Sequence, residues 1–383
     1  MVVASAPGKC ILFGEHAVVY GQPAVAIAID QRVQIEIQPT GKPGDVWQLD
    51  GMDFMPEKHP HLEGLRARIW PPSGETPSLS IKINSSIPSS AGLGSSAALS
   101  VAFTAALRAA RGRRVDENGW CEGFSSETET NPYPRPKKGK DPGFKRNGGK
   151  RLLGQSSVDE DECAIMGHAI EAEAQQGRAS PIDSSTVSHG GCILLSNEVK
   201  AGLDWKYSRS LKTPEGIRNW EIHEIVIPTE DVWLVIGNTG CHSSTAELVS
   251  QVAGLIELEP QKMQVIETIG AITRRGASAL IEGDMEKVGR CMTENHLLLR
   301  SLGVSSPELE NLVRAAAHSS LGVKLTGAGG GGCMIALTRN PKETGEAIEL
   351  AGGYSFKTSL NAIGVRLDSD RGAPFWTPGV ADS

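Results

Sequence analysis

The amino-acid sequence predicts a two-domain protein of the α+β class. The chain has 383 residues, which is more than one hydrophobic core usually organises and suits two domains of ordinary size. The predicted strands and helices come in blocks, whereas folds built on a parallel sheet alternate them regularly. Hydrophobic residues make up 39% of the chain and charged residues 22%, a balance that permits a globular core.

The first part of the chain is predicted to be mainly strand. Residues 24–29 form a short apolar run, and residues 33–37 and 79–84 alternate polar and apolar side chains with the period of a half-buried strand. Residues 2–38 therefore read as a strand, a glycine-rich turn and two further strands. From Ser95, a run of small and apolar residues without Gly or Pro predicts a helix that ends at an Arg-Gly pair.

The middle of the chain contains an insertion. Residues 112–158 are rich in Lys, Arg, Glu, Gly and Pro and poor in aliphatic residues, so they cannot bury enough surface to offset the entropy lost on ordering. We expect this segment to be mobile and unnecessary for the chemistry. A helix is predicted after it, from about Asp159 to about Gln176.

The remainder of the chain mixes strands with longer helical stretches. Apolar residues at helical spacing predict helices around residues 263–272 and 309–313. Further strands are expected at residues 191–196, 220–227, 232–236, 323–325, 334–337 and 364–367.

Charge and cysteine content argue against several classes of function. The chain has a formal net charge of −7 and no basic block, so we expect no binding to nucleic acid or to an anionic membrane. No run of about 18 apolar residues is present and charged residues interrupt the N-terminal segment, so neither a spanning helix nor a signal peptide is expected. The seven cysteines are scattered without a C-x-x-C pair, which argues against a zinc knuckle or a disulfide scaffold and favours a cytoplasmic location.

A loop of small residues precedes the helix that begins at Ser95. Its members are nearly all Gly, Ala or Ser, so backbone N–H groups can approach a polyphosphate, and the following helix adds unpaired donors and a positive partial charge. Serine hydroxyls in the loop can donate hydrogen bonds or bind magnesium. The predicted nucleotide-binding residues are Pro88, Ser90, Ala91, Gly92, Leu93, Gly94, Ser95, Ser96 and Ala97.

Two other phosphate-binding motifs fit this loop less well. The spacing Gly92-x-Gly94-x-x-Ala97 matches a dinucleotide fingerprint, but the strand before it alternates, whereas the first strand of a Rossmann unit is buried on both faces. The Walker A pattern G-x-x-x-x-G-K-[ST] is absent from the sequence. A Rossmann dehydrogenase therefore remains a distant alternative.

A second glycine-rich loop lies near the end of the sequence. Five of the six residues from Gly327 to Gly332 are glycine, which raises the entropy of the unfolded chain and implies that something approaches the backbone closely. A predicted strand follows it, so we expect a strand–loop–strand element that covers phosphates or packs against the first loop. Its predicted nucleotide contacts are Gly327, Ala328, Gly329 and Gly330.

Ionisable residues near these loops are candidates for chemistry. The patterns A-P-G-K at residues 6–9 and G-E-H at residues 14–16 are each weak alone. Glu171 and Glu173 lie near a predicted helix C-terminus, where carboxylates oppose the helix dipole, which is consistent with holding a cation. Asp183 lies in a predicted turn after that helix.

Taken in order, three motifs resemble those of the GHMP kinases, a family of small-molecule kinases. They are A-P-G-K with G-E-H, then P-x-x-x-G-L-G-S-S-A-A, then L-T-G-A-G-G-G-G-C. The likeness extends over most of the chain outside residues 112–158. Within the family, residues 5–30 and the pair Asn295-His296 followed by L-G-V are most similar to archaeal-type members that phosphorylate mevalonate.

The resemblance implies a fold and a set of ligands. Residues 1–205 would form a domain similar to the second domain of ribosomal protein S5, and residues 206–383 a ferredoxin-like domain. ATP, Mg²⁺ and mevalonate would bind in the cleft between them. A homodimer is common in the family.

The resemblance also implies roles for individual residues. Asp183 would act beside the substrate hydroxyl with Lys9 as its neighbour, because these positions match the family's acid and lysine. Glu15, His16 and Thr245 would shape the substrate pocket.

The implied magnesium ligands are a serine and one of two glutamates. Ser96 matches the family's magnesium-binding serine. Ala172 occupies the usual position of the metal-binding glutamate, and Glu171 and Glu173 flank it. The stretch from His168 to Glu171 resembles the archaeal-type members, which favours Glu171.

The activity that the resemblance implies is transfer of the ATP γ-phosphoryl group to the C5 hydroxyl of mevalonate. The product would be 5-phosphomevalonate, an intermediate of isoprenoid biosynthesis. Two alternatives stay open: another kinase of the family, acting on phosphomevalonate or homoserine, and a non-catalytic ligand sensor on the same fold.

Overall fold

The computed structural model describes most of the chain outside the predicted insertion. Of residues 112–158, only 144–146 and 158 are described, so the expectation of a mobile segment lies largely outside the described residues. Ser90 lies outside them as well. The described residues are 1–41, 46–70, 77–89, 91–111, 144–146, 158–175, 177, 179–213, 216–228, 231–373 and 375.

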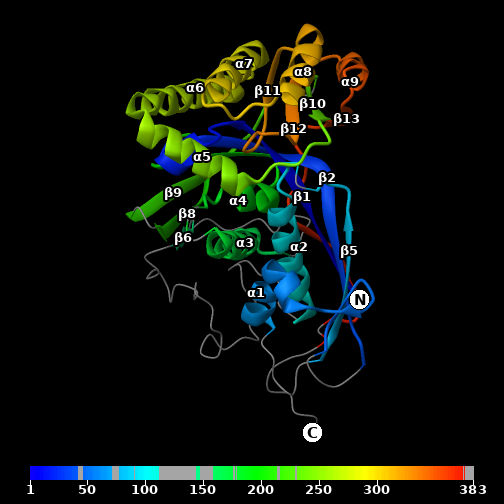
Figure 1. Cartoon of the computed structure of the whole chain (residues 1–383). Coiled ribbons are helices and arrows are strands. Elements are labelled where there is room, and N and C mark those ends of the chain that lie inside the picture. Colours follow the sequence, from blue (N-terminus) through cyan, green and yellow to red (C-terminus); the bar gives the residue numbers. More distant parts are fainter. Residues whose placement is uncertain are drawn as a thin grey trace.

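The larger of two sheets contains ten strands among the described residues (Figure 1). Its order is β4-β3-β5-β2-β7-β9-β8-β6, and β1 pairs with both β2 and β14. Every pairing is antiparallel except that of β3 with β5. The strands are β1 (Val2–Phe13), β2 (Ala24–Pro39), β3 (Gln48–Leu49), β4 (Met52–Asp53), β5 (Leu79–Ser85), β6 (Phe144–Arg146), β7 (Cys192–Ser196), β8 (Asp204–Thr213), β9 (Gly216–Ile225) and β14 (Arg366–Asp370).

Of the first four helices, α2, α3 and α4 contact this sheet, whereas α1 packs against α2 and α3 (Figure 1). Most of the residues of α2 are buried, and they contact β1 and β2, because small alanine side chains allow the helix to lie close to the sheet. The helices are α1 (Pro60–Ile69), α2 (Ser95–Ala110), α3 (Glu160–Ala174) and α4 (Ile182–His189). The helices predicted from Ser95 and after Asp159 are therefore confirmed.

The smaller sheet has the order β11-β12-β10-β13 and is antiparallel throughout. Along the chain, β10 is followed by helices, β11, β12, one more helix and β13, which is the βαββαβ pattern of the expected ferredoxin-like domain. Its strands are β10 (Trp233–Asn238), β11 (Gly322–Leu325), β12 (Cys333–Thr338) and β13 (Tyr354–Thr358). The helices are α5 (Thr245–Leu258), α6 (Met263–Glu282), α7 (Met285–Ser301), α8 (Pro307–Ala316) and α9 (Pro341–Leu350). Short 3₁₀ turns are η1 (Ala17–Tyr20), η2 (Pro56–Lys58), η3 (Pro260–Lys262) and η4 (Ala317–Ser319).

The structure differs from the sequence-based expectation in three places. β2 is one long strand where two were predicted, because both of its halves pair with β1. Asp183 lies in the first turn of α4, where a turn was expected. The predicted boundary between residues 205 and 206 falls inside β8, and the larger sheet continues through β9. We therefore place the change of sheet between Ile225 and Trp233.

β1 positions the site because it is buried along its whole length. All twelve of its residues are buried, and its register against β2 shifts between Pro7 and Lys9. A shift of this kind re-aims the side chain that follows it. None of the helices described here is long and apolar enough to cross a membrane.

Candidate active site

A cavity of about 500 Å³ is lined by residues of both domains. Residues of β1, α2, α3 and α4 line one side of it, and residues of the start of α5 and of the second glycine loop line the other. The predicted residues that line it are Lys9, Glu15, His16, Ala91, Gly92, Leu93, Gly94, Ser95, Ser96, Ala97, Glu171, Asp183, Thr245, Gly327, Ala328 and Gly329. Of the predicted residues that the structure describes, three are not among the lining residues: Pro88, Glu173 and Gly330.

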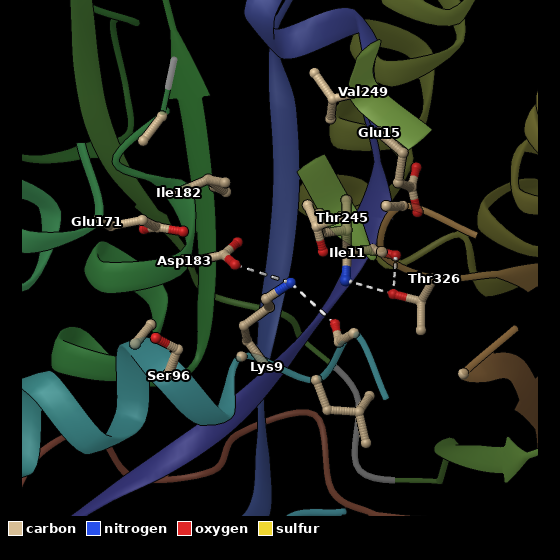
Figure 2. A pocket seen from close by; sticks show the side chains of 18 of the residues that line it. Lys9, Ile11, Glu15, Ser96, Glu171, Ile182, Asp183, Thr245, Val249 and Thr326 are labelled. Atoms are coloured by element: carbon tan, nitrogen blue, oxygen red, sulfur yellow. Dashed lines mark hydrogen bonds and ion pairs between the residues drawn. The ribbon is translucent and has the colours of Figure 1, made fainter. Parts of the chain in front are cut away.

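Lys9 lines this cavity between the first glycine loop and α4 (Figure 2). Its ammonium group is 3.1 Å from a carboxylate oxygen of Asp183 and donates a hydrogen bond of 3.1 Å to the carbonyl oxygen of Gly92. Its backbone N–H donates to the Leu93 carbonyl at 2.9 Å. Only 3% of the Lys9 side chain is exposed, so the charge has little water and depends on these partners.

Glycines on both sides of Lys9 permit this close approach. A Cβ atom on Gly8 would lie 2.8 Å from the Leu93 carbonyl oxygen, and a Cβ atom on Gly94 would lie 2.8 Å from Cγ of Lys9. Gly94 also has a φ of +73°, which favours glycine. The small residues of the two motifs therefore fit against each other and against the lysine stem.

The N-terminus of α2 opens into the cavity without a side-chain cap. Gly94 is its N-cap residue and supplies no hydrogen-bonding side chain, and Ser95 and Ser96 follow in the first turn. Among the other helices, α3, α5, α7 and α8 each have an Asp or Ser cap, whereas α1, α4, α6 and α9 also lack a side-chain cap. The first N–H groups of a helix have no partner within the helix and attract anions. This helix end can therefore bind a phosphate group.

Glu171 rather than Glu173 lines the cavity. One carboxylate oxygen of Glu171 accepts a 3.1 Å hydrogen bond from Gln175, and the other is buried with no hydrogen-bond partner among the described residues. Figure 2 shows the carboxylate directed toward Asp183, with Ser96 nearby on α2. Burial, and next the negative charge of Asp183, raise the pKa of Glu171 to about 8. Glu173 is instead 66% exposed and pairs with Arg68 at 2.7 Å.

The second glycine loop packs directly on the first. A Cβ atom on Gly327 would lie 3.1 Å from Cα of Gly92, and one on Gly332 would lie 2.9 Å from the Ala91 carbonyl oxygen. Gly330 is turned to the other side, where its N–H donates to the Val304 carbonyl at 2.8 Å. Several of these glycines are therefore required by contact between loops.

The Gly14–His16 turn forms another wall of the cavity. The His16 ring nitrogen Nε2 lies 2.9 Å from the Ala328 carbonyl oxygen, and burial lowers the pKa of His16. Glu15 is buried and forms an ion pair with Lys324. Thr245, at the start of α5, faces the same space in Figure 2.

Four residues of this region with ionisable or amide side chains were not assigned roles from the sequence. His61 and Gln175 line the cavity, and Asn295 and Lys324 contact Glu15 behind it. Lys324 immediately precedes the L-T-G-A-G motif, and Asn295 belongs to a stretch already noted as similar to the family. Both residues could therefore have been considered as site residues from the sequence. His61 is an isolated histidine, and no local pattern marks it.

Two models of one protein family match parts of the sequence on either side of the cavity. The model for the GHMP kinases N terminal domain matches residues 63–130, and the model for the GHMP kinases C terminal matches residues 277–352. A mevalonate kinase of Pyrococcus abyssi is 30% identical over 399 aligned positions, which cover 97% of this chain and 99% of the relative. One from Thermococcus onnurineus is 32% identical and covers 96% of this chain and 98% of the relative.

A solved structure extends the comparison to three dimensions. The mevalonate kinase of Methanococcus jannaschii has a TM-score of 0.63 at 26% identity, covering 93% of this chain and 97% of that one. The two proteins therefore share the same overall fold. The chain belongs to the GHMP kinase family, and within that family it belongs to the mevalonate kinases.

Proposed function

We propose that this protein transfers the γ-phosphoryl group of ATP to the C5 hydroxyl of mevalonate, giving 5-phosphomevalonate and ADP. The observation that carries the proposal is the Lys9–Asp183 pair, 3.1 Å apart, in one cavity with the uncapped N-terminus of α2. An acceptor alcohol beside Asp183 would then lie near a phosphate held at the helix end. Phosphoryl transfer depends mainly on such positioning and on neutralisation of charge.

The reaction is a direct in-line displacement. The C5 hydroxyl oxygen attacks the γ-phosphorus, the bond from that phosphorus to the bridging oxygen breaks, and ADP leaves. Asp183 accepts the hydroxyl proton or holds the hydroxyl in line while it attacks. Lys9, whose ammonium group lies 3.1 Å from the Asp183 carboxylate, orients that carboxylate and stabilises the charge that develops on the transferred group.

The residues present fit a magnesium ion. Glu171 presents a buried carboxylate oxygen without a hydrogen-bond partner among the described residues, and the Ser96 hydroxyl is exposed in the same cavity. When bound, the ion would neutralise phosphate charge. Among the described residues no group of three or more His, Cys, Asp and Glu could hold a metal, and Mg²⁺ usually needs only one or two carboxylates plus substrate phosphates.

Charge in the cavity favours mevalonate over phosphomevalonate. Lys9 is the only lysine or arginine among the described residues that line it, and it already pairs with Asp183. A substrate with a phosphate of its own would need further cations. His16 and Thr245 offer polar contacts for a smaller substrate.

Replacing Glu171 by Gln is expected to raise the Mg²⁺ concentration that gives half-maximal rate by about tenfold or more. Glu173→Gln is the matched control, because its carboxylate is exposed and pairs with Arg68 outside the cavity. Magnesium titrations of the initial rate at saturating ATP and mevalonate make the comparison. An equal effect of both substitutions would contradict the assignment of Glu171.

The magnesium requirement is expected to fall as pH rises. With its pKa at about 8, Glu171 is mostly protonated at neutral pH, and the ion must displace that proton. The ionised fraction grows about tenfold between about pH 7 and pH 9, so the apparent Mg²⁺ affinity should increase by a similar factor. The same titrations on Glu171→Gln correct for the ionisation of ATP itself. A pH dependence that survives in this variant would assign it to another group.

The proposed activity is tested by ADP release, measured with ATP and mevalonate, phosphomevalonate, homoserine or galactose in parallel. We expect turnover with mevalonate alone. Turnover of another substrate would replace the assignment within the family. Saturable binding of ATP and mevalonate without any turnover would instead support a ligand sensor.

A further inference from the structure

We infer that Lys324 and Asn295 are positioning residues of the active site, which hold the Glu15 carboxylate so that it fixes the Gly14–His16 turn instead of binding the substrate. This inference rests on the proposed function. Glu15 follows β1 of the larger sheet, whereas Lys324 lies on β11 and Asn295 on α7. The contact therefore joins the two domains beside the cavity.

Both oxygens of the Glu15 carboxylate are occupied by protein groups. Oε1 forms the ion pair with Lys324, and Oε2 accepts a 3.0 Å hydrogen bond from the Asn295 amide. The side chains of Glu15 and Lys324 are 1% and 0% exposed, so neither charge is hydrated. A carboxylate that is already paired in this way is poorly placed to accept a hydrogen bond from a substrate.

The ammonium group of Lys324 also has all of its donors paired with protein oxygens. Its ammonium group donates to the backbone carbonyl oxygens of Ile11 at 3.3 Å and Leu325 at 2.6 Å, in addition to its pair with Glu15. An ammonium group has three N–H donors, so no donor remains for a ligand. Burial lowers the pKa of Lys324, and the adjacent Glu15 opposes that effect.

The turn held by this cluster is strained and lines the cavity. His16 has a φ of +59°, which is rare for a residue other than glycine, and it makes the contact with the Ala328 carbonyl in the second glycine loop. A strained conformation persists only where surrounding contacts hold it. Glu15 is the adjacent residue, and its anchoring by Lys324 and Asn295 supplies that restraint.

Removing one charge of a buried pair leaves the other without a partner, whereas removing both is much better tolerated. This difference separates the two possible roles of Glu15. If Glu15 only positions the turn, Lys324→Met should be partly rescued by a second substitution, Glu15→Gln, because the orphaned carboxylate is removed. If Glu15 binds the substrate directly, the second substitution should deepen the defect.

The experiment compares the wild type with Lys324→Met, Glu15→Gln and the double variant, by kcat and by KM for mevalonate and for ATP. We expect Lys324→Met to raise KM for mevalonate about tenfold or more with a smaller change in KM for ATP, and the double variant to recover at least about fivefold of that loss. Lys342→Met, at a lysine whose side chain is 91% exposed, is the control.

The inference would be overturned by unchanged kinetics in Lys324→Met, or by a double variant that is worse than either single variant. Circular dichroism and thermal unfolding check folding of each variant. If Lys324→Met does not fold, Asn295→Ser is used instead, because it removes only the neutral amide donor to Glu15. This variant should give the same selective rise in KM for mevalonate. An unchanged KM for mevalonate in Asn295→Ser would also overturn the inference. Absence of turnover in the wild type would instead refute the proposed function.

Discussion

The Asp183→Asn variant is expected to lose about 10³- to 10⁴-fold in kcat while its affinity for ATP changes by less than about twofold. Asparagine keeps the shape of the side chain but can neither accept the hydroxyl proton nor carry the charge that pairs with Lys9. The α2 N-terminus and the first glycine loop remain intact, so the phosphates should bind as before. The defect should therefore lie in the chemical step.

Single-turnover measurements with saturating ATP and mevalonate, together with calorimetric titration of Mg-ATP, separate chemistry from binding. Asp204→Asn is a suitable control, because its carboxylate is exposed and pairs with Lys206 on β8, in the part of the sheet away from the cavity. A loss of less than about tenfold in Asp183→Asn would remove this residue from the role of base and leave positioning as its function.

Gly94→Ala is expected to lower kcat/KM for both substrates by about 100-fold or more. The added Cβ would lie 2.8 Å from Cγ of Lys9, so the lysine stem must shift, and we expect this to weaken the contacts of its ammonium group with Asp183 and the Gly92 carbonyl. The substitution also places a side chain at φ +73°, at a cost of about 1 kcal/mol in stability.

Gly202→Ala is the matched control for Gly94→Ala. Gly202 has a φ of +84°, so alanine suffers similar backbone strain there, but no atom lies within 4 Å of the added Cβ. Thermal unfolding should therefore show comparable losses for the two variants, and steady-state kinetics a loss for Gly94→Ala alone. Wild-type kinetics in Gly94→Ala would mean that Lys9 tolerates displacement, which contradicts its assigned position.

Local patterns in the sequence were sufficient to predict much of the fold. The helix beginning at Ser95 and the two strands that flank the second glycine loop were predicted because their signals lie within a few neighbouring residues. The continuity of β2 was missed because it depends on the pairing of both of its halves with β1, which no window of sequence contains. α4 was missed because Ser and Thr, which favour turns when alone, fill its short length.

The candidate site, too, could be predicted only in part from the sequence. Lys9, the first glycine loop and Asp183 could be placed together only through the resemblance to a family, since their separation in the chain is large. The choice between Glu171 and Glu173 depends on which side of α3 faces α4, and the sequence favoured the residue that the structure places in the cavity. The pairing of Glu15 with Lys324 joins opposite ends of the chain, and neither residue alone predicts it.

The return of the chain in β14 has a consequence for how the molecule can be divided. β14 pairs with Val2–Ser5, the first part of β1, and Lys9 lies farther along the same strand. In sequence, β14 comes only after all the strands of the smaller sheet. Neither half of the polypeptide is then self-sufficient: a fragment that stops before β10 would leave a bare strand edge, prone to pairing with other chains. Expression of the two halves as separate chains should fail to give folded protein. Fusion partners or tags placed after Asp370 need a spacer, so that β14 can still pair with β1.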